Sequence, residues 1–525
     1  MRRWFLSERE RGNDATSLGA GSARNLCTPL VHGATYFGRL AECVERAQDG
    51  DRLYFTDWRG DPDQLLTDDG PTVAEMLSSA AGRGVCVRGL VWRSHVDFLQ
   101  FSAEQNRALD REVEAGGGQV VLDQRVRRFG SHHQKLVVLR HPQRPEDDVA
   151  FVGGIDLCHS RRDDQHHRGD PQAVLMSAAY GSTPPWHDVQ LEVRGPAVAD
   201  FEAVFRERWN DPVNAEADNP LARLSAILRR DRTTPTPLPA ALPPPPPAGD
   251  QHVQALRTYP AIRPRYTFAP AGERSIARGY SKAVRQATRL VYVEDQYFWS
   301  RDAGRLFATA LAEQPSLHLI AVLPRHPDQS SAFVAVPNRI GQAEVLQMCR
   351  AAGGDRLHVF DLENHESQPV YVHANACVVD DVWATVGSDN VNRRSWTHDS
   401  ELTAAVLDTR HDDRDPRDPR GDGSSARVFA RDLRLQLVRE HLDRDDGDDA
   451  DLLDPASCAA AMDSSADALE AWHAGGHVGP RPPGRLRRHR PARPRLVTRM
   501  WATPVLRGLH DPDGRSLGLR RAQDF

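Results

Sequence analysis

The sequence predicts an α/β protein made of two duplicated halves. Short apolar runs alternate with helical patterns through most of the chain, which is typical of a layered fold with a largely parallel sheet. The pattern also repeats, because 81 positions separate Arg52 from His133 and 84 positions separate Arg289 from His373. Each histidine lies just before an apolar run, and a glycine-containing turn follows that run. Such agreement between two halves indicates duplication of a whole structural unit.

The elements of the first half follow from the period and composition of their residues. Runs of β-branched and aromatic residues predict strands, and longer stretches with apolar residues three or four apart predict helices. We expect, in order, a helix over 36–49, a strand over Arg52–Trp58, a helix over Val73–Gly82, a strand over Val85–Trp92, a helix over Ser102–Ala115 and a strand over Gln119–Leu122. The apolar run that follows His133 predicts one more buried strand.

The second half shows the same order of elements. We expect a helix over Ser275–Ala287, a strand over Arg289–Phe298, a strand over Leu317–Leu323, a helix near Ile340–Ala352 and a short strand over Leu357–Phe360. The strand predicted after His373 corresponds to the one after His133. The turns Val152–Asp156 and Val386–Asn390 then match each other, with six more residues before the first turn than before the second.

At 525 residues the chain is too long for a single core. A stretch with five consecutive prolines, Pro243–Pro247, predicts a stiff, extended and exposed linker between the halves. We therefore expect a first half over residues 1–229, a proline-rich linker over 230–251, a second half over 252–456 and a basic C-terminal tail over 457–525. Eight arginines lie between Arg481 and Arg499, a pattern that could contact acidic lipid headgroups or nucleic acid.

Composition excludes several classes of protein. The formal net charge is −6, so the chain as a whole does not attract nucleic acid or acidic lipid. Its seven cysteines include no CxxC pair, and we expect neither a disulfide framework nor a zinc site. No apolar run approaches the ~20 residues of a membrane-spanning helix. Charges in Met1–Glu10 stand where a signal peptide needs apolar residues, so we expect a cytoplasmic protein that could also associate peripherally with membranes.

The segment around His133 carries the first sign of chemistry. Lys135 lies two positions after His133, so an extended backbone directs both side chains to the same side. An imidazole beside an ammonium suits a phosphoryl group, as nucleophile or proton carrier and as point charge. Of the 67 lysines and arginines only Lys135 and Lys282 are lysine, which indicates that this position needs a lysine.

A related segment occurs in the second half, where His373 is followed by Asn375 and Asp380. Together the two segments resemble the paired His-x-Lys-x4-Asp motifs of the phospholipase D superfamily. Both are incomplete, because Arg140 stands at the Asp position of the first motif and Asn375 at the Lys position of the second. The resemblance covers most of residues 30–410, and it is closer to the two-motif members that act on phospholipids than to the nucleases. Further matching segments are Gly153–Asp156, Pro185–Asp188, Val293–Phe298, Gly387–Asn390, Asn392–Ser395 and Asp399–Glu401.

The resemblance implies two sandwich-like halves related by a pseudo-twofold axis, with both histidines at one site. It also implies a phospholipase D-type phosphodiesterase that hydrolyses or transfers the headgroup of a glycerophospholipid at a membrane surface. His133 would form a phosphohistidine while His373 protonates the leaving alcohol. No metal and no cofactor is expected. Two carboxylates would orient the histidines, Asp188 on His133 and Glu401 on His373, and the phosphate would contact Lys135, Asn375, Asn390, Ser388, Gly154 and Asp156.

Two departures from the motif leave other functions open. Arg140 reverses a charge, for which the nearby Glu146 or Asp147 could compensate by folding back, and Asn375 removes the charge that a lysine would place beside phosphate. Losing one preorganised donor typically lowers a rate by ~10²–10³. The alternatives are therefore a weakened paralogue that binds phospholipid without turnover, and a nucleic-acid phosphodiesterase of the same fold. Neither the lipid headgroup, the acceptor alcohol nor the oligomeric state follows from the sequence.

Overall fold

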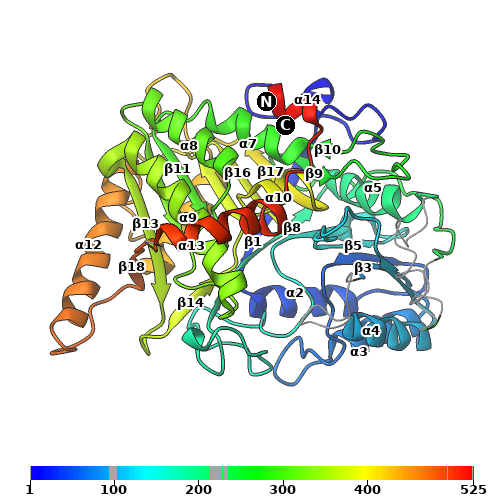
Figure 1. Cartoon of the computed structure of the whole chain (residues 1–525). Coiled ribbons are helices and arrows are strands. Elements are labelled where there is room, and N and C mark those ends of the chain that lie inside the picture. The colour runs from blue at the N-terminus through cyan, green and yellow to red at the C-terminus, as the bar shows by residue number, and fades with distance from the viewer. Residues whose placement is uncertain (1, 94–102, 213–227, 229–233, 493–494, 523) are drawn as a thin grey trace.

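The computed structural model describes residues 2–93, 103–212, 228, 234–492, 495–522 and 524–525. Two β-sheets lie beside each other, each with helices on its outer side (Figure 1). The mixed α/β class and the duplication that the sequence predicts are confirmed by the pairing of the strands. Part of the helix that we expect over Ser102–Ala115 lies outside the described residues.

Among the described residues, the first sheet contains seven strands in the order β4, β3, β2, β5, β6, β8 and β1. Strands β2, β3 and β4 are parallel to one another, and the remaining neighbours are antiparallel. Their bounds are β1 Ser22–Val31, β2 Arg52–Asp57, β3 Cys86–Trp92, β4 Gln119–Asp123, β5 Leu136–Arg140, β6 Val149–Gly153 and β8 Val189–Arg194.

The second sheet has the same order and the same directions: β13, β12, β11, β15, β16, β17 and β9. The bounds are β9 Gln251–Tyr259, β11 Leu290–Glu294, β12 His318–Val322, β13 Leu357–Glu363, β15 Ala376–Val379, β16 Trp383–Gly387 and β17 Glu401–Asp408. Strand β5 therefore corresponds to β15, and the turns after β6 and β16 are equivalent. This shared topology is what a duplicated sequence requires.

Successive side chains of a strand point to opposite faces of the sheet, so they enter two different hydrophobic cores in turn. In β5, Leu136 and Val138 belong to the central core, whereas Val137 and Leu139 pack under the outer helices. Both faces are thus apolar, which explains why these strands read as continuous apolar runs. The outer helices are α2 Gly33–Glu45, α3 Val73–Gly82 and α4 Glu104–Ala115 on the first sheet, and α7 Ser275–Val284, α8 Arg301–Glu313 and α9 Ala332–Gly353 on the second.

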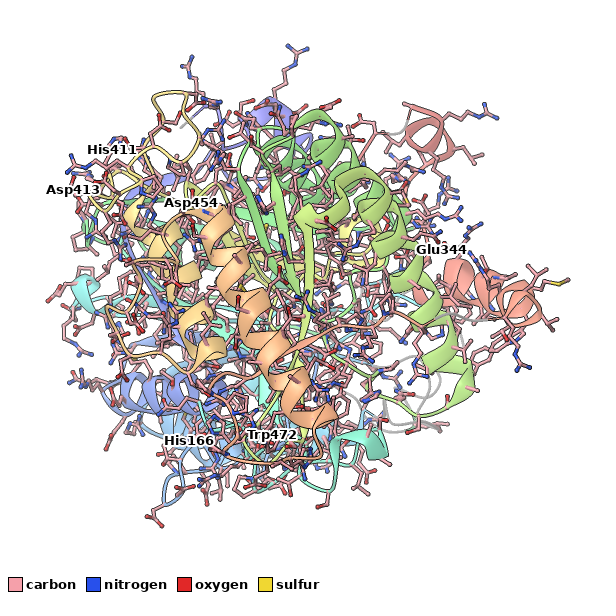
Figure 2. The ribbon with its side chains drawn as sticks, turned by 90° about the vertical axis from the view of Figure 1, so that its left-hand side faces the viewer. His166, Glu344, His411, Asp413, Asp454 and Trp472 are labelled. Atoms are coloured by element: carbon pink, nitrogen blue, oxygen red, sulfur yellow. The ribbon has the colours of Figure 1, made fainter. Side chains whose placement is uncertain are left out.

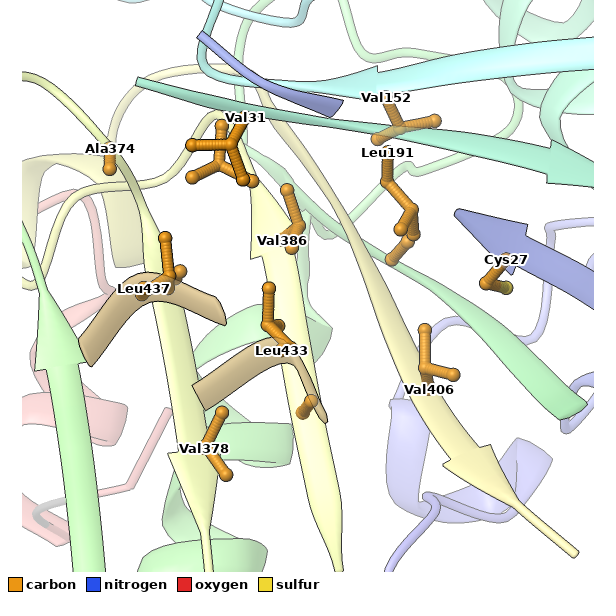
Figure 3. Packing of buried hydrophobic residues seen from close by; sticks show 14 of the residues in the cluster. Cys27, Val31, Val152, Leu191, Ala374, Val378, Val386, Val406, Leu433 and Leu437 are labelled. Carbon is orange, nitrogen blue, oxygen red and sulfur yellow. The ribbon is translucent and has the colours of Figure 1, made fainter. Parts of the chain in front are cut away.

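The central core joins the two halves. It combines side chains from both sheets with those of α5 (Ala197–Trp209) and α11 (Val428–Leu442). Figure 3 shows part of this cluster, with Val152 and Leu191 of the first half near Val386 and Val406 of the second. The burial of one continuous apolar cluster between the halves favours a fixed relative placement of the two sheets.

The linker and the C-terminal segment both pack on the protein. In the described part of the linker, the carbonyls of Thr234, Thr236 and Pro243 accept hydrogen bonds from side chains of the first half. Beyond the second half, helix α12 (Pro455–Ala474) begins after its capping residue Asp454 and lies over the strands of that half, with Trp472 near its other end (Figure 2). Strand β18 (Leu486–Arg488) then adds to the edge of β13.

Short elements complete the fold. They are α1 Glu8–Arg11, β7 Trp186–His187, β10 Glu273–Arg274, β14 Pro369–Val372, α10 Arg393–Thr397, α13 Leu496–Val505 and α14 Leu517–Ala522, with single turns at Pro145–Asp147, Ala178–Tyr180, Gly354–Arg356 and Leu506–His510. Within the described part of the chain, no helix combines the length and apolar character needed to span a bilayer.

Candidate active site

His133 lies three residues before β5, on a segment that crosses to the second half. Its backbone N–H donates to the carbonyl of Ser400 over 2.9 Å, and the preceding residue forms a parallel bridge with Ser400. This contact places Glu401, the first residue of β17, against the imidazole. The Nδ1 atom of His133 lies 2.9 Å from Oε2 of Glu401.

His373 has the mirrored arrangement at the end of β14. Strand β14 pairs in parallel with β7 of the first half, and the His373 N–H donates to the carbonyl of His187 over 2.8 Å. Asp188 follows directly, and its Oδ2 atom lies 2.7 Å from Nδ1 of His373. Both histidines thus meet a carboxylate through the same ring nitrogen.

These two contacts correct the predicted pairing of histidines and carboxylates. The predicted pairing keeps each dyad within one half, with Asp188 on His133 and Glu401 on His373. Instead each carboxylate belongs to the opposite half. The reason is the exchange of backbone hydrogen bonds at Ser400 and at His187, which brings each histidine segment onto the strand of the other half. Sequence neighbours could not reveal this, because the exchange is a tertiary contact.

The carboxylates fix the tautomers of both imidazoles. A carboxylate accepts hydrogen bonds, so Nδ1 carries the proton in each ring and Nε2 keeps its lone pair when the ring is neutral. The His133 side chain is 16% exposed and that of His373 is 6% exposed. Burial lowers the pKa of His373 below its ordinary value, although the Asp188 carboxylate opposes this shift.

Lys135 is buried beneath His133. Its Nζ donates to the His133 carbonyl over 3.2 Å and lies 3.6 Å from Oδ1 of Asp156. Asp156 also lies 3.4 Å from the guanidinium of Arg161, and these two cations hold its pKa below the ordinary value against the effect of burial. Burial and the Asp156 charge together raise the pKa of the adjacent Asp57. The sequence prediction missed Asp57 and Arg161, because nothing in their local pattern marks them.

The equivalent side chains of the second half carry no charge. Asn375 donates from Nδ2 to the carbonyl of Ser388 over 3.3 Å. Among the described residues, no group donates to Oδ1 of Asn375 or to Oδ1 of Asn390, although both atoms are buried. The Ser388 hydroxyl donates to Glu401 over 2.6 Å, so this residue, predicted to contact phosphate, holds the carboxylate that orients His133.

Gly154 makes room for Asp188. A Cβ atom at this glycine would lie 2.4 Å from Oδ1 of Asp188, which is far inside van der Waals contact. Its backbone N–H is engaged with the carbonyl of Val189 over 3.2 Å. Close approach of the two backbones therefore explains this glycine. Trp186 supports the same carboxylate, because its indole N–H donates to Oδ2 of Asp188 over 3.3 Å.

Arg140 is fully buried and neutralised by residues of its own half. Its Nε donates to Asp148 over 2.7 Å, and its guanidinium also contacts Glu202 and the Pro243 carbonyl. The expectation that Glu146 or Asp147 would compensate is wrong. Both lie in an exposed turn, and the next residue, Asp148, supplies the buried carboxylate.

Side chains that could hold a metal ion lie around β7. Among the described residues, two groups have ligand atoms close enough to share an ion. The first group is His32, His167, His187 and Glu440, and the second is His187, Glu294 and His441. Neither group includes His133 or His373.

Comparison with known proteins places this geometry in context. A family model described as phospholipase D matches residues 64–237. Phospholipase D alpha 1 of Vigna unguiculata is 26% identical over 455 residues, which cover 63% of this chain and 54% of that protein. Phospholipase D2 of Bos taurus is 25% identical over 482 residues, or 72% of this chain and 49% of that protein. The chain therefore spans about half the length of these two relatives.

The comparison with solved structures gives a weaker similarity. Phosphatidylserine synthase of Haemophilus influenzae Rd KW20 superposes with a TM-score of 0.48 and 13% sequence identity. The superposition covers 73% of this chain and 82% of that chain.

Proposed function

We propose that this chain, which belongs to the phospholipase D superfamily, is a phosphodiesterase that hydrolyses or transfers the headgroup of a glycerophospholipid. The observation that carries the proposal is the pair of crossed dyads, His133 with Glu401 and His373 with Asp188. Two histidines with the same tautomer, each fixed by a carboxylate, supply a nucleophile and an acid for one phosphodiester.

His133 is our candidate nucleophile. Its Nδ1–H donates to Glu401, so the Nε2 lone pair is free to attack phosphorus. The new N–P bond forms as the bond from phosphorus to the leaving oxygen breaks, and His373 gives its Nε2 proton to that oxygen. In the second step His373 takes a proton from water or an acceptor alcohol. The resulting oxygen attacks phosphorus, and the N–P bond to His133 breaks.

The role of His373 as acid requires a proton that burial disfavours. Its pKa lies below the ordinary value in the free protein. A bound phosphodiester brings a negative charge beside the imidazole, which favours the protonated form. We therefore expect substrate binding to raise the pKa of His373. Proton uptake on binding a phosphodiester analogue would report this change.

We assign the groups around the two histidines to two tasks. Lys135, Asn375 and Asn390 are the candidate donors for phosphate oxygens, since an ammonium and two amides supply N–H groups. Asp156, Ser388 and Gly154 act through other residues, because Asp156 faces Lys135, Ser388 holds Glu401, and Gly154 leaves room for Asp188. This division replaces the expectation that all six touch phosphate.

Two features of the C-terminal segment favour a substrate in a membrane surface. Helix α13 exposes Leu496, Val497 and Met500, each more than 70% accessible, together with the partly exposed Trp501. Figure 2 shows this helix projecting from the body beyond Glu344, to which Arg499 is bonded over 3.1 Å. The next turn contacts Arg394, whose guanidinium also bonds the Phe129 carbonyl on the loop that leads to His133. An apolar helix linked to that loop suits contact with lipid.

Part of the basic tail, the feature that favours nucleic acid, is paired within the protein. Arg487, Arg488 and Arg490 of the predicted basic tail form ion pairs with carboxylates of the second half and of α12. Binding of phospholipid without turnover stays a second candidate, because Asn375 leaves the His373 side of the site without a lysine.

Headgroup release from vesicles tests the proposal. The wild-type chain should release headgroup from mixed phosphatidylcholine, phosphatidylethanolamine and phosphatidylglycerol vesicles, and it should transfer phosphatidyl groups to added ethanol. His133→Ala should lose about 10⁴-fold or more in rate, as removal of a nucleophile does. His166→Ala, which changes an exposed histidine of the first half (Figure 2), is the matched control and should match wild type. Equal rates for wild type and His133→Ala would overturn the assignment, and vesicle binding with no release would favour the binding function.

A further inference from the structure

A second cluster of histidines lies one residue from the candidate active site. His32, His167 and His187 are each at most 3% exposed, and they surround the carboxylate of Glu440, whose side chain is 14% exposed. One ligand atom from each of the four lies within 4.8 Å of the others. No pattern in the sequence marks this cluster, because its members come from four separate segments.

We propose that these four side chains bind one divalent transition-metal ion of the Zn²⁺ type, which fastens the first half to helix α11. Imidazole nitrogens and a carboxylate oxygen are the ligands that such ions prefer. The Glu440 oxygens lie 2.8 Å from His32 Nε2, 3.0 Å from His167 Nε2 and 3.5 Å from His187 Nδ1. With bonds of ~2.0–2.2 Å, ligand atoms around a tetrahedral Zn²⁺ lie about 3.3–3.6 Å apart. The His187 distance already matches this spacing, and the two shorter distances would lengthen by about half an ångström when an ion enters.

The hydrogen bonds of His167 leave a lone pair directed at the carboxylate. Its Nδ1 lies 2.9 Å from the carbonyl of Trp186, and a carbonyl oxygen can only accept. Nδ1 therefore carries the hydrogen. In the neutral ring Nε2 is then an acceptor, yet it faces an oxygen of Glu440 at 3.0 Å. Two acceptors in contact call for a cation between them.

The hydrogen bonds of His187 likewise leave a lone pair directed at Glu440. Its Nε2 lies 2.6 Å from Oε2 of Glu294, a carboxylate that accepts the N–H. Its Nδ1 is then the lone-pair nitrogen; this atom is buried, has no hydrogen-bond partner among the described residues, and points toward Glu440. An unpartnered acceptor in a fully buried side chain is unfavourable unless it binds an ion or a proton.

The surroundings of the cluster have the form of an outer coordination shell. Metal-bound histidines usually donate their other N–H to a carboxylate or a carbonyl. His187 donates to the Glu294 carboxylate and His167 to the Trp186 carbonyl, whereas Nδ1 of His32 has no partner among the described residues. Glu294 is itself held by the hydroxyl of Tyr292 over 2.5 Å and by His441 over 2.7 Å. These contacts fix the directions of the nitrogens before any ion arrives.

The position of the cluster links it to the reaction site without entering it. His187 accepts the backbone N–H of His373 through its carbonyl and precedes Asp188. Glu440 comes from α11, at the end of the second half, whereas the three histidines belong to the first half. A bound ion would therefore hold β7, and with it Asp188, in place against the second half. Its role is positioning, and the phosphoryl chemistry does not pass through it.

Metal content tests this inference independently of lipid turnover. The full-length chain, stripped with chelator and dialysed against micromolar Zn²⁺, should retain about one ion per chain by elemental analysis. Replacement with Co²⁺ should give the visible absorption of a site with nitrogen ligands. Chelation should lower the melting temperature, and added Zn²⁺ should restore it, since an ion bound only by the folded state stabilises it.

Variants then locate the ion. Glu440→Gln removes a charged ligand and should weaken Zn²⁺ binding at least 10-fold, and Glu294→Gln should weaken it about 10- to 100-fold through the outer shell. His358→Gln is the matched control. This largely buried histidine lies 2.8 Å from Asp463 and 3.1 Å from His318, and it belongs to neither group of possible metal ligands found among the described residues. His477→Ala removes an exposed histidine pair that could take up Zn²⁺ at the surface, and it should leave the tight site intact.

Two results would overturn the inference. One is wild-type protein that retains no ion and melts at the same temperature with and without chelator; protons alone would then bridge the cluster, with His187 as an imidazolium between Glu294 and Glu440. The other is loss of the bound ion in His477→Ala but not in Glu440→Gln. Because both readouts are made without substrate, a failure here is distinct from a failure of the proposed phosphodiesterase.

Discussion

In the first half Lys135 faces the carboxylate of Asp156 at 3.6 Å, whereas the second half places the amides of Asn375 and Asn390 at the corresponding positions. The first half thus has an ion pair at these positions, and the second half has two neutral amides. The Oδ1 atom of each amide is buried and accepts no hydrogen bond among the described residues. Each arrangement is neutral overall. The same fold can therefore accommodate either arrangement. A buried charge is tolerated when an opposite charge accompanies it, and a neutral pair needs no such partner.

The same comparison applies at the far end of the motif strands. Arg140 is balanced by Asp148 and Glu202, while its counterpart Asp380 accepts three backbone N–H groups at the start of β11 and an ion pair from Arg420. The charge at this position has been reversed, yet it is neutralised in both halves. The residue type therefore matters less than the presence of its partners. This explains how a charge-reversed motif can still support the fold.

The largest effect should come from exchanging one orienting carboxylate for an amide. Glu401→Gln keeps the shape but removes the charge that stabilises an imidazolium at His133, so turnover should fall by about 10²–10⁴. Asp188→Asn should have a similar effect through His373. Nitrogen NMR of the ring atoms distinguishes the crossed pairs, since Glu401→Gln should alter the spectrum of His133 and leave that of His373 unchanged. The reverse pattern would contradict the crossed arrangement.

Reversing the buried charge of Arg140 in the first half should have the next largest effect, a loss of stability. Arg140→Asp would place three carboxylates together in a buried site, and we expect a loss of about 3–5 kcal/mol in the free energy of unfolding. Urea titration measures it. Arg490→Asp changes an exposed pair with Glu470 and should stay below about 1 kcal/mol. If the two variants unfold at the same urea concentration, the Arg140 cluster is not a determinant of stability.

A gain of activity is expected from Asn375→Lys. The new ammonium would supply a charged donor beside His373, and the rate of headgroup release could rise by up to about 10²-fold. The added charge also lowers the pKa of His373, which opposes part of the gain. Asn375→Met, which removes the donor without adding charge, is the control and should be slower than wild type. If lysine and methionine variants behave alike, the second half does not contact phosphate through residue 375.

The smallest expected effect is on the pH dependence of stability, and it comes from a third residue that differs between the halves. Ile155 of the first turn corresponds to Asp389 of the second, and both are buried. Burial, with the nearby Glu401 and Asp295 charges, raises the pKa of Asp389 to about 8. Between pH 3.8, the ordinary pKa of an aspartate, and about pH 8, Asp389 is protonated in the folded state and ionised in the unfolded state. The free energy of unfolding should therefore fall as the pH rises through this range.

For one group the slope is at most about 1.4 kcal/mol per pH unit. Asp389→Asn should flatten the dependence by that amount between pH 5 and 8, as measured by chemical denaturation at each pH. Asp413→Asn, at an exposed position of an acidic loop, is the control and should leave the slope as in wild type. A steeper dependence in Asp389→Asn than in wild type would show that the proton lies elsewhere.

Short stretches of sequence were enough to predict the two halves, their strands and the histidines that begin each motif. Continuous apolar runs predict strands that are buried on both faces, and repetition of their spacing predicts duplication, because both signals are local and occur twice. The proline run likewise predicts the extended linker. These features depend only on the chemistry of adjacent residues, which is why His133, Lys135 and His373 stand out from their immediate neighbours alone.

Which side chains meet depends on contacts between segments that are distant in the sequence. The crossing of Glu401 and Asp188 depends on backbone contacts between the halves, and Asp148 rather than Glu146 or Asp147 reaches Arg140 because of the shape of one turn. The cluster of His32, His167, His187 and Glu440 joins residues separated by up to 408 positions. Contacts over such distances follow from how layers pack, and packing is set by the whole chain rather than by any short pattern.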